Sequence, residues 1–320
     1  MAEQLSLFGE ESTLFNTAVR RLLEMEFDRC LEVLERYRKL FPWGRKVDTE
    51  VEVAKFWKSK LDQVGWAQIS PAEAERRYEV WVKFEETFDY PWRKDSIKEQ
   101  LRVVFFAKLA DGLEAGGHSG LPELPGGTPL GLIYLMAHRL DAAIDSLQTL
   151  IAAEPENSRA YGYLGDTYML RGDPPMARLC YREAFVITPT KVDLPRLQDD
   201  GLKKRLDELI ENEDHEGNSL AWFPVKAQLE GIFERRVFRD LEDLKHWLQR
   251  YLELSKVYNR NEDPALVPRL FYQAMVLSDN APMMRFIKKV ELSELRRKMK
   301  KWHPALFAKH MSLLEGRRTG

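Results

Sequence analysis

Histidine and cysteine are the side chains in this sequence that most often serve as metal ligands, nucleophiles or proton carriers. The two cysteines, Cys30 and Cys180, cannot form a disulfide framework, and no group of cysteines and histidines has the spacing of a zinc site. We expect both thiols to be buried and unpaired, and we expect no metal ion and no cofactor. The histidines are scattered along the chain, as His118, His138, His215, His246, His303 and His310.

Phosphate-binding loops and metalloprotease motifs would be further sources of chemistry. The chain has neither a GxxxxGK[ST] loop nor an HExxH motif. Residues 116–120 read Gly-Gly-His-Ser-Gly, but no strand–turn–helix pattern surrounds them to support a nucleophile or a phosphate cradle. We therefore expect no catalysis, and a hydrolase or transferase without a recognisable motif is the alternative.

The composition narrows the classes of function. Of the 320 residues, 44% are hydrophobic and 31% are charged, with a net charge of -2. This allows one extended core or several smaller ones, and it argues against capture of nucleic acid or membrane by overall charge. The first twelve residues lack the pattern of a signal peptide, and the longest apolar run, 129–137, is too short to cross a bilayer. These features predict a cytoplasmic protein with no membrane partner.

The elements that position any site are predicted to be helices throughout, because no alternating strand pattern appears. The fold class is therefore all-α. Ser70, Pro71 and Glu73 mark one helix start with a capping serine, a proline at the first helical position and a glutamate three residues after the cap. We expect a flexible tail at 1–12, an N-terminal helical region at 13–115, a Gly/Pro-rich linker at 116–127, helical hairpins with a capping helix at 128–212, and a C-terminal helical region at 219–315.

Similar residues recur 34 positions apart in the centre of the chain, which is the spacing of a helical repeat. Gly131 and Gly165 occupy the first helix of successive hairpins, where they allow the two helices of a hairpin to approach closely. The other matching pairs are Leu130 and Leu164, Tyr134 and Tyr168, Ala143 and Ala177, Leu147 and Tyr181, and Pro155 and Pro189. The prolines cannot continue a helix, so each turns the chain into the next unit.

This pattern resembles the tetratricopeptide repeat family, and the resemblance covers about a fifth of the chain. It implies stacked helical hairpins with a concave groove that binds peptides or proteins. A degenerate third copy is indicated by Leu14, Ala18, Cys30, Leu34 and Pro42. After Pro189 the register fails, and Leu194, Leu197, Leu202, Leu206 and Leu209 predict an amphipathic capping helix instead.

The resemblance also implies which residues line the groove. Carried over by register, they are Thr128, Leu132, Leu135 and Met136 in one hairpin and Arg159, Gly162, Asp166 and Met169 in the other. The first set is apolar. Either a partner's apolar side chains lie against it, or this chain's own flanking helices cover it, and we favour the second. Arg159 and Asp166 are either groove residues or a solvated surface.

The N-terminal pentapeptide Gln4-Leu5-Ser6-Leu7-Phe8 resembles the peptide by which bacterial DNA polymerases and repair proteins dock on the sliding clamp. Gln4 would offer an amide to a polar pocket, and Leu5, Leu7 and Phe8 would enter an apolar cleft. The alternative is that these apolar side chains pack against the chain's own first helix.

Two further clusters carry aromatic and basic side chains. The aromatic residues Trp57, Trp66, Tyr78, Trp81, Phe84, Phe88, Tyr90 and Trp92 are expected to form core rather than a stacking platform for bases. Residues 285–318 contain eleven Lys or Arg and three acids, which indicates either a solvated helix or a surface that binds nucleic acid.

The sequence thus predicts a protein-interaction adaptor that uses a tetratricopeptide-like groove to bind a protein or peptide. The alternative is an accessory of DNA replication, repair or phage defence, tethered to the sliding clamp by its N-terminus.

Overall fold

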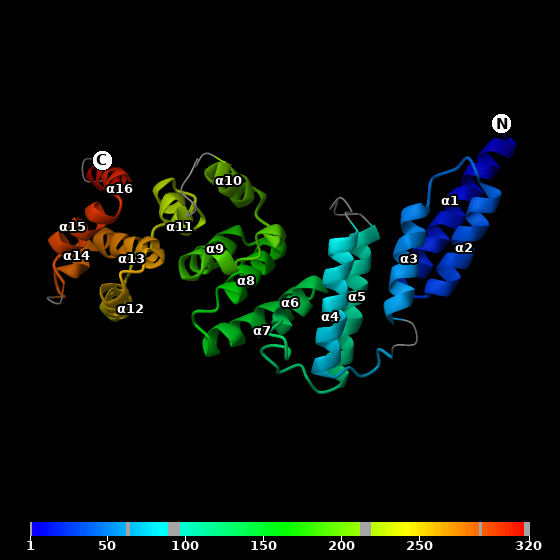
Figure 1. Cartoon of the computed structure of the whole chain (residues 1–320), viewed down its shortest axis with the longest axis horizontal. Coiled ribbons are helices and arrows are strands. Elements are labelled where there is room, and N and C mark those ends of the chain that lie inside the picture. The colour runs from blue at the N-terminus through cyan, green and yellow to red at the C-terminus, as the bar shows by residue number, and fades with distance from the viewer. Residues whose placement is uncertain (1, 62–64, 89–96, 212–218, 288–289, 317–320) are drawn as a thin grey trace. The chain divides into compact units, whose positions relative to one another are not determined.

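The computed structural model describes residues 2–61, 65–88, 97–211, 219–287 and 290–316, and the side chains of all of these except 2–8, 210, 211 and 219. The described residues form sixteen α-helices, three short 3-10 helices and no strand (Figure 1). One isolated β-bridge joins Glu123 and Pro129. The all-helical fold class predicted from the sequence is therefore confirmed.

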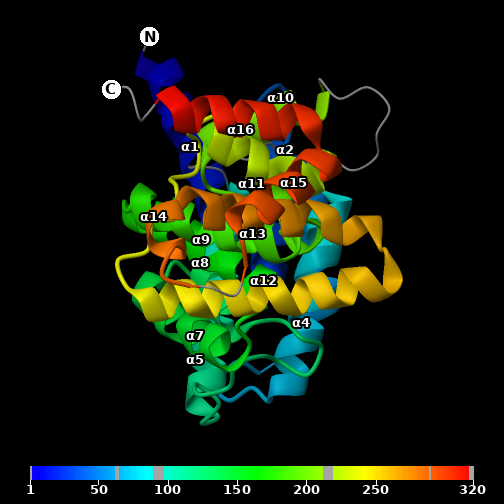
Figure 2. The same ribbon diagram turned by 90° about the vertical axis from the view of Figure 1, so that its left-hand side faces the viewer.

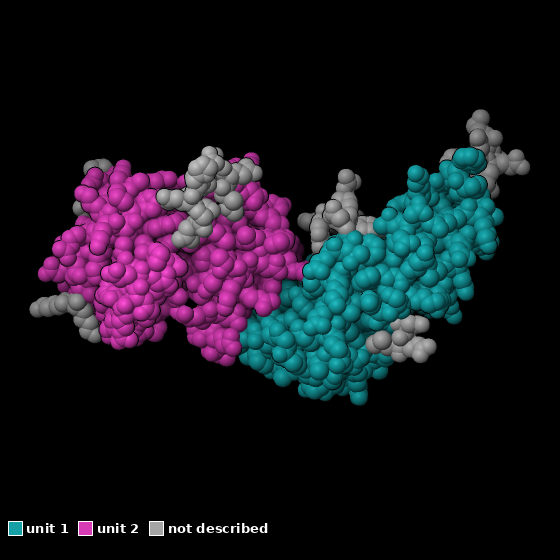
Figure 3. Space-filling view, viewed as in Figure 1, with its two compact units in different colours: residues 1–150 teal, residues 151–320 magenta. Residues whose placement is uncertain are grey.

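The chain divides into two compact units, residues 1–150 and 151–320 (Figure 3). The sequence predicted a division at the Gly/Pro-rich stretch 116–127, about thirty residues earlier. The structure instead places the division inside helix α7, between Leu150 and Ile151.

The first unit contains six helices and most of a seventh. Its helices are α1 (Ala2–Leu23), α2 (Phe27–Leu40), α3 (Asp48–Leu61), α4 (Pro71–Thr87), α5 (Ile97–Ala115), α6 (Leu130–Met136) and α7 (Leu140–Ala153). The tail expected at 1–12 differs from the structure, in which α1 begins at Ala2 and continues without a break. Gly9 is the only residue of low helix propensity between Ala2 and Glu11, so little in the sequence interrupts the helix there.

Local signals in the sequence set the start of α4. The Ser70 hydroxyl accepts a hydrogen bond from the Glu73 backbone amide at 3.3 Å, and Pro71 is the first helical residue. This is the capped start predicted from the sequence. Arg77, on the buried side of α4, donates to the Gly65 carbonyl at 2.8 Å and lies over the Trp66 ring, which fixes the chain before the helix.

Aromatic side chains form the core between α3, α4 and α5. Trp57, Trp81 and Phe105 are buried, and the Trp57 and Trp81 rings stack with centroids 5.7 Å apart. The Trp81 and Phe105 centroids are 5.3 Å apart. The core interpretation of this cluster is confirmed for these rings, while Tyr90 and Trp92 lie outside the described residues.

The Gly/Pro-rich stretch forms an ordered loop rather than a loose linker. The Glu75 carboxylate on α4 accepts hydrogen bonds from the Gly126 amide at 3.1 Å and from the Thr128 hydroxyl at 2.7 Å. Leu124 is buried, and its amide donates to the Thr128 carbonyl at 2.8 Å. The absence of helix was predicted correctly, but a partner distant in sequence, Glu75, orders the loop.

The second unit begins with a helical hairpin and ends with a cluster of helices. Its helices are α8 (Ser158–Arg171), α9 (Pro174–Ile187), α10 (Asp200–Glu211), α11 (Ser219–Leu229), α12 (Leu241–Asn261), α13 (Val267–Asp279), α14 (Ala281–Met284), α15 (Leu292–Trp302) and α16 (Pro304–Gly316), with short 3-10 turns at Pro189–Lys191, Leu194–Arg196 and Pro264–Leu266. The capping helix predicted from Leu194 onward starts only at Asp200.

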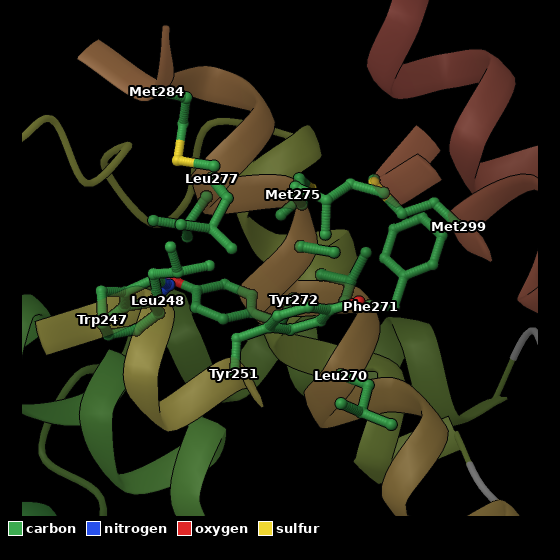
Figure 4. Close-up of a cluster of buried hydrophobic side chains, with 14 of the residues drawn as sticks. Trp247, Leu248, Tyr251, Leu270, Phe271, Tyr272, Met275, Leu277, Met284 and Met299 are labelled. Carbon is green, nitrogen blue, oxygen red and sulfur yellow. The ribbon is translucent and has the colours of Figure 1, made fainter. Parts of the chain in front are cut away.

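Helix α13 is the centre of the C-terminal helices. It contacts α11, α12 and α15, and Figures 1 and 2 show it between α12 and the α15–α16 pair. Leu270, Phe271 and Met275 of α13 are fully buried. Tyr251 of α12 and Met299 of α15 close the same core (Figure 4).

Candidate functional site

We call the side of α8 that carries Arg159, Gly162, Asp166 and Met169 the α8 face. It is the most distinctive candidate site in the described chain. Sequence signals position this helix at both ends. The Asn157 side chain caps its start by accepting from the Ala160 amide at 3.1 Å, and Gly172 ends it in a left-handed conformation, with φ 85°. The Asp173 carboxylate then caps α9 by accepting from the Met176 amide at 3.2 Å. The hairpin α8–α9 is thus defined by local residues.

Asp166 lies at the centre of this face and is buried, with only 2% of its surface exposed. Its Oδ1 accepts a hydrogen bond from the Tyr181 hydroxyl of α9 at 2.6 Å and another from the Gln198 backbone amide at 3.0 Å. The two donors are themselves 3.3 Å apart. A single carboxyl oxygen therefore joins both helices of the hairpin to a segment more than thirty residues along the chain.

Burial governs the protonation of this carboxyl. Removal from water raises the pKa of Asp166 to about 8, although the hydrogen bonds from Tyr181 and Gln198 act in the opposite direction. Burial, followed by the nearby Asp166, also raises the pKa of the Tyr181 hydroxyl. Burial therefore favours the uncharged forms of both Asp166 and Tyr181.

The segment that covers this face is residues 189–199, which we call the strap. It is non-helical apart from its two 3-10 turns, and Val192 and Leu197 within it are buried. The Tyr163 hydroxyl of α8 lies 3.3 Å from a carboxylate oxygen of Asp193 in the strap. Asp199 ends the strap: it pairs with Arg178 of α9 at 3.1 Å and caps α10 through the Leu202 amide at 3.0 Å.

The four positions predicted on α8 have different environments. Gly162 and Asp166 are buried under the strap, whereas Arg159 and Met169 are only partly buried. A methyl group added at Gly162 would meet Val192 at an ordinary contact distance of 3.7 Å. The structure therefore corrects the interpretation of Arg159 and Asp166 as a solvated pair, because Asp166 bonds to Tyr181 and the strap instead.

The four positions predicted in the other hairpin are all buried. Leu132, Leu135 and Met136 are at most 6% exposed. Helix α5 packs against α6, and its Arg102 contacts the Met136 sulfur at 3.8 Å. Thr128 is also buried, and its hydroxyl donates to the Glu75 carboxylate. The alternative that the chain covers its own apolar face is therefore correct for these residues, and they offer no open groove in this structure.

The two hairpins share one geometric feature at the predicted offset. A Cβ atom placed on Gly131 would lie 2.4 Å from the Leu147 side chain, and one placed on Gly165 would lie 2.6 Å from the Tyr181 ring. Helices α7 and α9 begin and end 34 residues apart, at Leu140 and Pro174 and at Ala153 and Ile187. The first helices differ, because the ordered loop replaces the first part of α6.

The backbone of the N-terminal pentapeptide lies within α1, and the side chains of Gln4, Leu5, Ser6, Leu7 and Phe8 lie outside the described residues.

The basic C-terminal region contains helix α15, whose side chains are described. Leu295 and Met299 of α15 are buried, while Arg297, Lys300 and Lys301 are exposed. Apolar side chains of α15 therefore pack inward, and these three cations face solvent.

An acid–histidine pair that sequence reasoning missed joins α13 to α16. The Asp279 carboxylate accepts from Arg235 at 3.0 Å and lies 2.9 Å from the His310 ring, and both Asp279 and His310 are almost completely buried. Burial alone would raise the pKa of Asp279, but the His310 and Arg235 contacts outweigh it and leave that pKa below its ordinary value. Their separation of 31 residues gives no local signal, so only the fold reveals the pair.

The part of the chain that the structure describes contains no candidate metal site and no candidate membrane-spanning helix. No group of three or more His, Cys, Asp or Glu side chains among the described residues is placed to hold a metal ion. Within the same residues, no helix is both long enough and apolar enough to span a bilayer. Comparisons with protein-family models, with curated proteins and with solved structures found no match for this chain.

Proposed function

We propose that this chain is a protein-interaction adaptor of the tetratricopeptide type, without catalytic activity, and that the α8 face binds an extended protein segment. The observation that carries the proposal is the hydrogen bond from the Gln198 backbone amide to Asp166. A buried carboxyl that accepts a main-chain amide recognises an extended segment largely without regard to its sequence.

The strap then acts as an intramolecular occupant of the α8 face. Its contacts combine one main-chain hydrogen bond, one side-chain contact between Tyr163 and Asp193, and the buried side chains Val192 and Leu197. Alternating apolar anchors and amide contacts are the means by which extended peptides are held on protein surfaces. The repeated glycine contacts at Gly131 and Gly165 support the tetratricopeptide comparison.

The proposal is tested by moving the strap from the chain to a separate peptide. In one variant, residues 189–199 are replaced by a Gly/Ser segment of equal length, and a synthetic peptide of residues 188–199 is titrated into it by calorimetry. We expect binding with a dissociation constant on the order of micromolar, because a short flexible peptide loses entropy when it binds. The control peptide carries Leu197→Asp and is expected not to bind.

A second measurement covers the case in which the replaced variant does not fold. Hydrogen exchange at the Gln198 amide in the intact protein reports how often the strap leaves the α8 face. We expect exchange by local opening, faster than that of the central amides of α8. Failure of the peptide to bind a folded variant, or exchange of Gln198 only with global unfolding, would overturn the proposal.

The alternative function is an accessory of DNA metabolism tethered to the sliding clamp, and one observation favours it. Arg297, Lys300 and Lys301 are exposed on α15, where they are available to phosphate groups. Reversing these three charges should weaken DNA binding and reduce its dependence on salt.

Replacing Leu7 and Phe8 by Ala should abolish binding to the host's sliding clamp without changing the melting temperature. Absence of clamp binding by the wild-type protein would rule out the tether.

A further inference from the structure

The turn between α2 and α3 presents the most exposed aromatic side chain in the described chain. Trp43 is 96% exposed, and Leu40, the last residue of α2, is 50% exposed. Phe41, only two residues before Trp43, packs against the Tyr37 ring with centroids 5.6 Å apart. The Phe41 ring therefore packs against the protein, whereas the Trp43 ring does not. Packing does not explain the position of Trp43.

The turn itself is held in one conformation. The Arg45 amide donates to the Tyr37 hydroxyl at 2.9 Å, and that hydroxyl donates to Glu11 of α1 at 2.6 Å. A Cβ atom placed on Gly44 would lie 2.6 Å from the Glu11 carboxylate and 2.9 Å from the Tyr37 hydroxyl. Trp43 thus projects from an ordered turn, so little backbone conformational entropy is lost when it contacts a ligand.

The segment that carries Trp43 is rich in basic residues. Residues 36–46, which we call the α2–α3 tip, contain five cations and no acid, in a chain whose net charge is -2. Arg38 pairs with Asp48, and Arg45 pairs with Glu50 at 3.3 Å. The remaining three, Arg36, Lys39 and Lys46, are exposed and form no ion pair with any described residue.

The tip lies at one end of the first unit. Figure 1 shows the α2–α3 connection at the end of the α1–α2 pair that also carries the N-terminus. The contact between Glu11 and Tyr37 joins α1 to α2 near this end. The indole and the exposed cations therefore project from a helix end into solvent.

We propose that the α2–α3 tip binds single-stranded nucleic acid, with the Trp43 indole stacked on a base and the surrounding cations in contact with phosphates. An unpaired strand supplies both of the groups that the tip complements, a regularly spaced anionic backbone and exposed flat rings. An anionic membrane matches the charge only, because the exposed apolar area is limited to Trp43 and Leu40. This inference is independent of the α8 face and of the clamp tether.

Fluorescence anisotropy of the full-length protein with a labelled oligothymidine of about ten nucleotides tests the inference. Trp43→Ala should weaken binding about tenfold or more, whereas Trp43→Phe, which keeps an aromatic face, should retain most of the affinity. The double variant Arg36→Glu/Lys39→Glu should reduce affinity further and make the dependence on salt less steep, by about 0.7 for each phosphate that the variant no longer neutralises. Because these side chains are exposed, circular dichroism should show unchanged helical content.

Two control variants distinguish the tip from a general effect of charge and from α15. The variant Lys60→Glu/Lys204→Glu changes the net charge equally at exposed positions outside the tip, and it should bind like the wild type. Charge reversal at Arg297 and Lys300 tests α15 separately. The inference would be overturned if the wild-type protein does not bind the oligonucleotide, or if Trp43→Ala binds it with unchanged affinity. Loss of binding in the α15 variant alone would also overturn it. So would tip-dependent binding to anionic phosphatidylserine vesicles without binding to the oligonucleotide.

Discussion

Two glycines three residues apart on α8 have different neighbours, and the difference decides what a methyl group would do at each. At Gly162 the new carbon meets Val192 at 3.7 Å, an ordinary contact. At Gly165 it meets the Tyr181 ring at 2.6 Å, and that ring is fixed by its bond to Asp166. Both glycines lie inside a helix, where replacement by alanine otherwise favours folding.

We predict that Gly165→Ala lowers the free energy of unfolding by about 1–3 kcal/mol, because the hairpin would be overpacked. Gly162→Ala should be neutral or stabilising by up to about 1 kcal/mol, because alanine has the higher helix propensity. Urea denaturation of the two variants makes the comparison within one helix. Equal stabilities would contradict the close contact between α8 and α9.

Asp166 should make stability depend on pH in a direction unusual for a carboxyl group. Its pKa rises from 3.8 to about 8 on folding, so the folded protein keeps a proton that the unfolded chain has released. The free energy of unfolding should therefore fall as pH rises from about 4 to about 8, by at most about 1.4 kcal/mol per pH unit. Asp166→Asn should flatten this slope in denaturation curves measured at several pH values, and an unchanged slope would contradict the assignment.

At the scale of the elements, the capped starts of α4, α8 and α9 were predictable, whereas the contacts made by the connecting segments were not. Ser70, Asn157 and Asp173 form their caps with amides three residues away, so the sequence contains all of the information. The loop at 116–129 and the strap depend on Glu75 and Asp166, which lie tens of residues distant. Glycine and proline indicate where a helix stops, but they do not indicate what the loop contacts.

The Gly/Pro-rich loop should therefore be loosened by one substitution on a neighbouring helix. Glu75→Ala removes the acceptor for the Gly126 amide and the Thr128 hydroxyl, and we predict a loss of roughly 1–3 kcal/mol in stability. Limited proteolysis should cut the variant near Gly126 faster than the wild type. Glu79→Ala, one helical turn further along α4 at an exposed position, should leave the loop intact. Equal cleavage rates in both variants would contradict the anchoring role of Glu75.

At the scale of the whole molecule, the sequence predicted the helical class but not the division into units. The 34-residue offset identifies which helix faces are equivalent, and the contacts at Gly131 and Gly165 agree with it. Periodicity does not show what covers a helix face, and the predicted groove positions Leu132 and Asp166 are buried by this chain. The apolar character of the first set was the one signal in the sequence that favoured burial.

Each unit contains one cysteine, which makes the thiols reporters of the two units. Cys30 and Cys180 are buried and unpaired, as predicted, and burial raises the pKa of each thiol to about 12. Both low exposure and a scarcity of thiolate should make labelling by a thiol reagent slow in the native protein. Mass spectrometry should show labelling of each cysteine accelerating only as denaturant opens its own unit. Rapid labelling of either thiol without denaturant would contradict the burial.

The order of the strap along the chain has a consequence for synthesis on the ribosome. Residues 158–187 complete the α8–α9 hairpin before the residues that cover it, including Gln198, have been translated. At about 5–20 residues per second, the strap follows the hairpin after an interval on the order of a second. During that interval the Asp166 carboxyl lacks one of its two donors, and the apolar sites of Val192 and Leu197 are open to chaperones and to neighbouring nascent chains. Slower elongation while the strap emerges from the ribosome would lengthen this exposure without altering the finished protein.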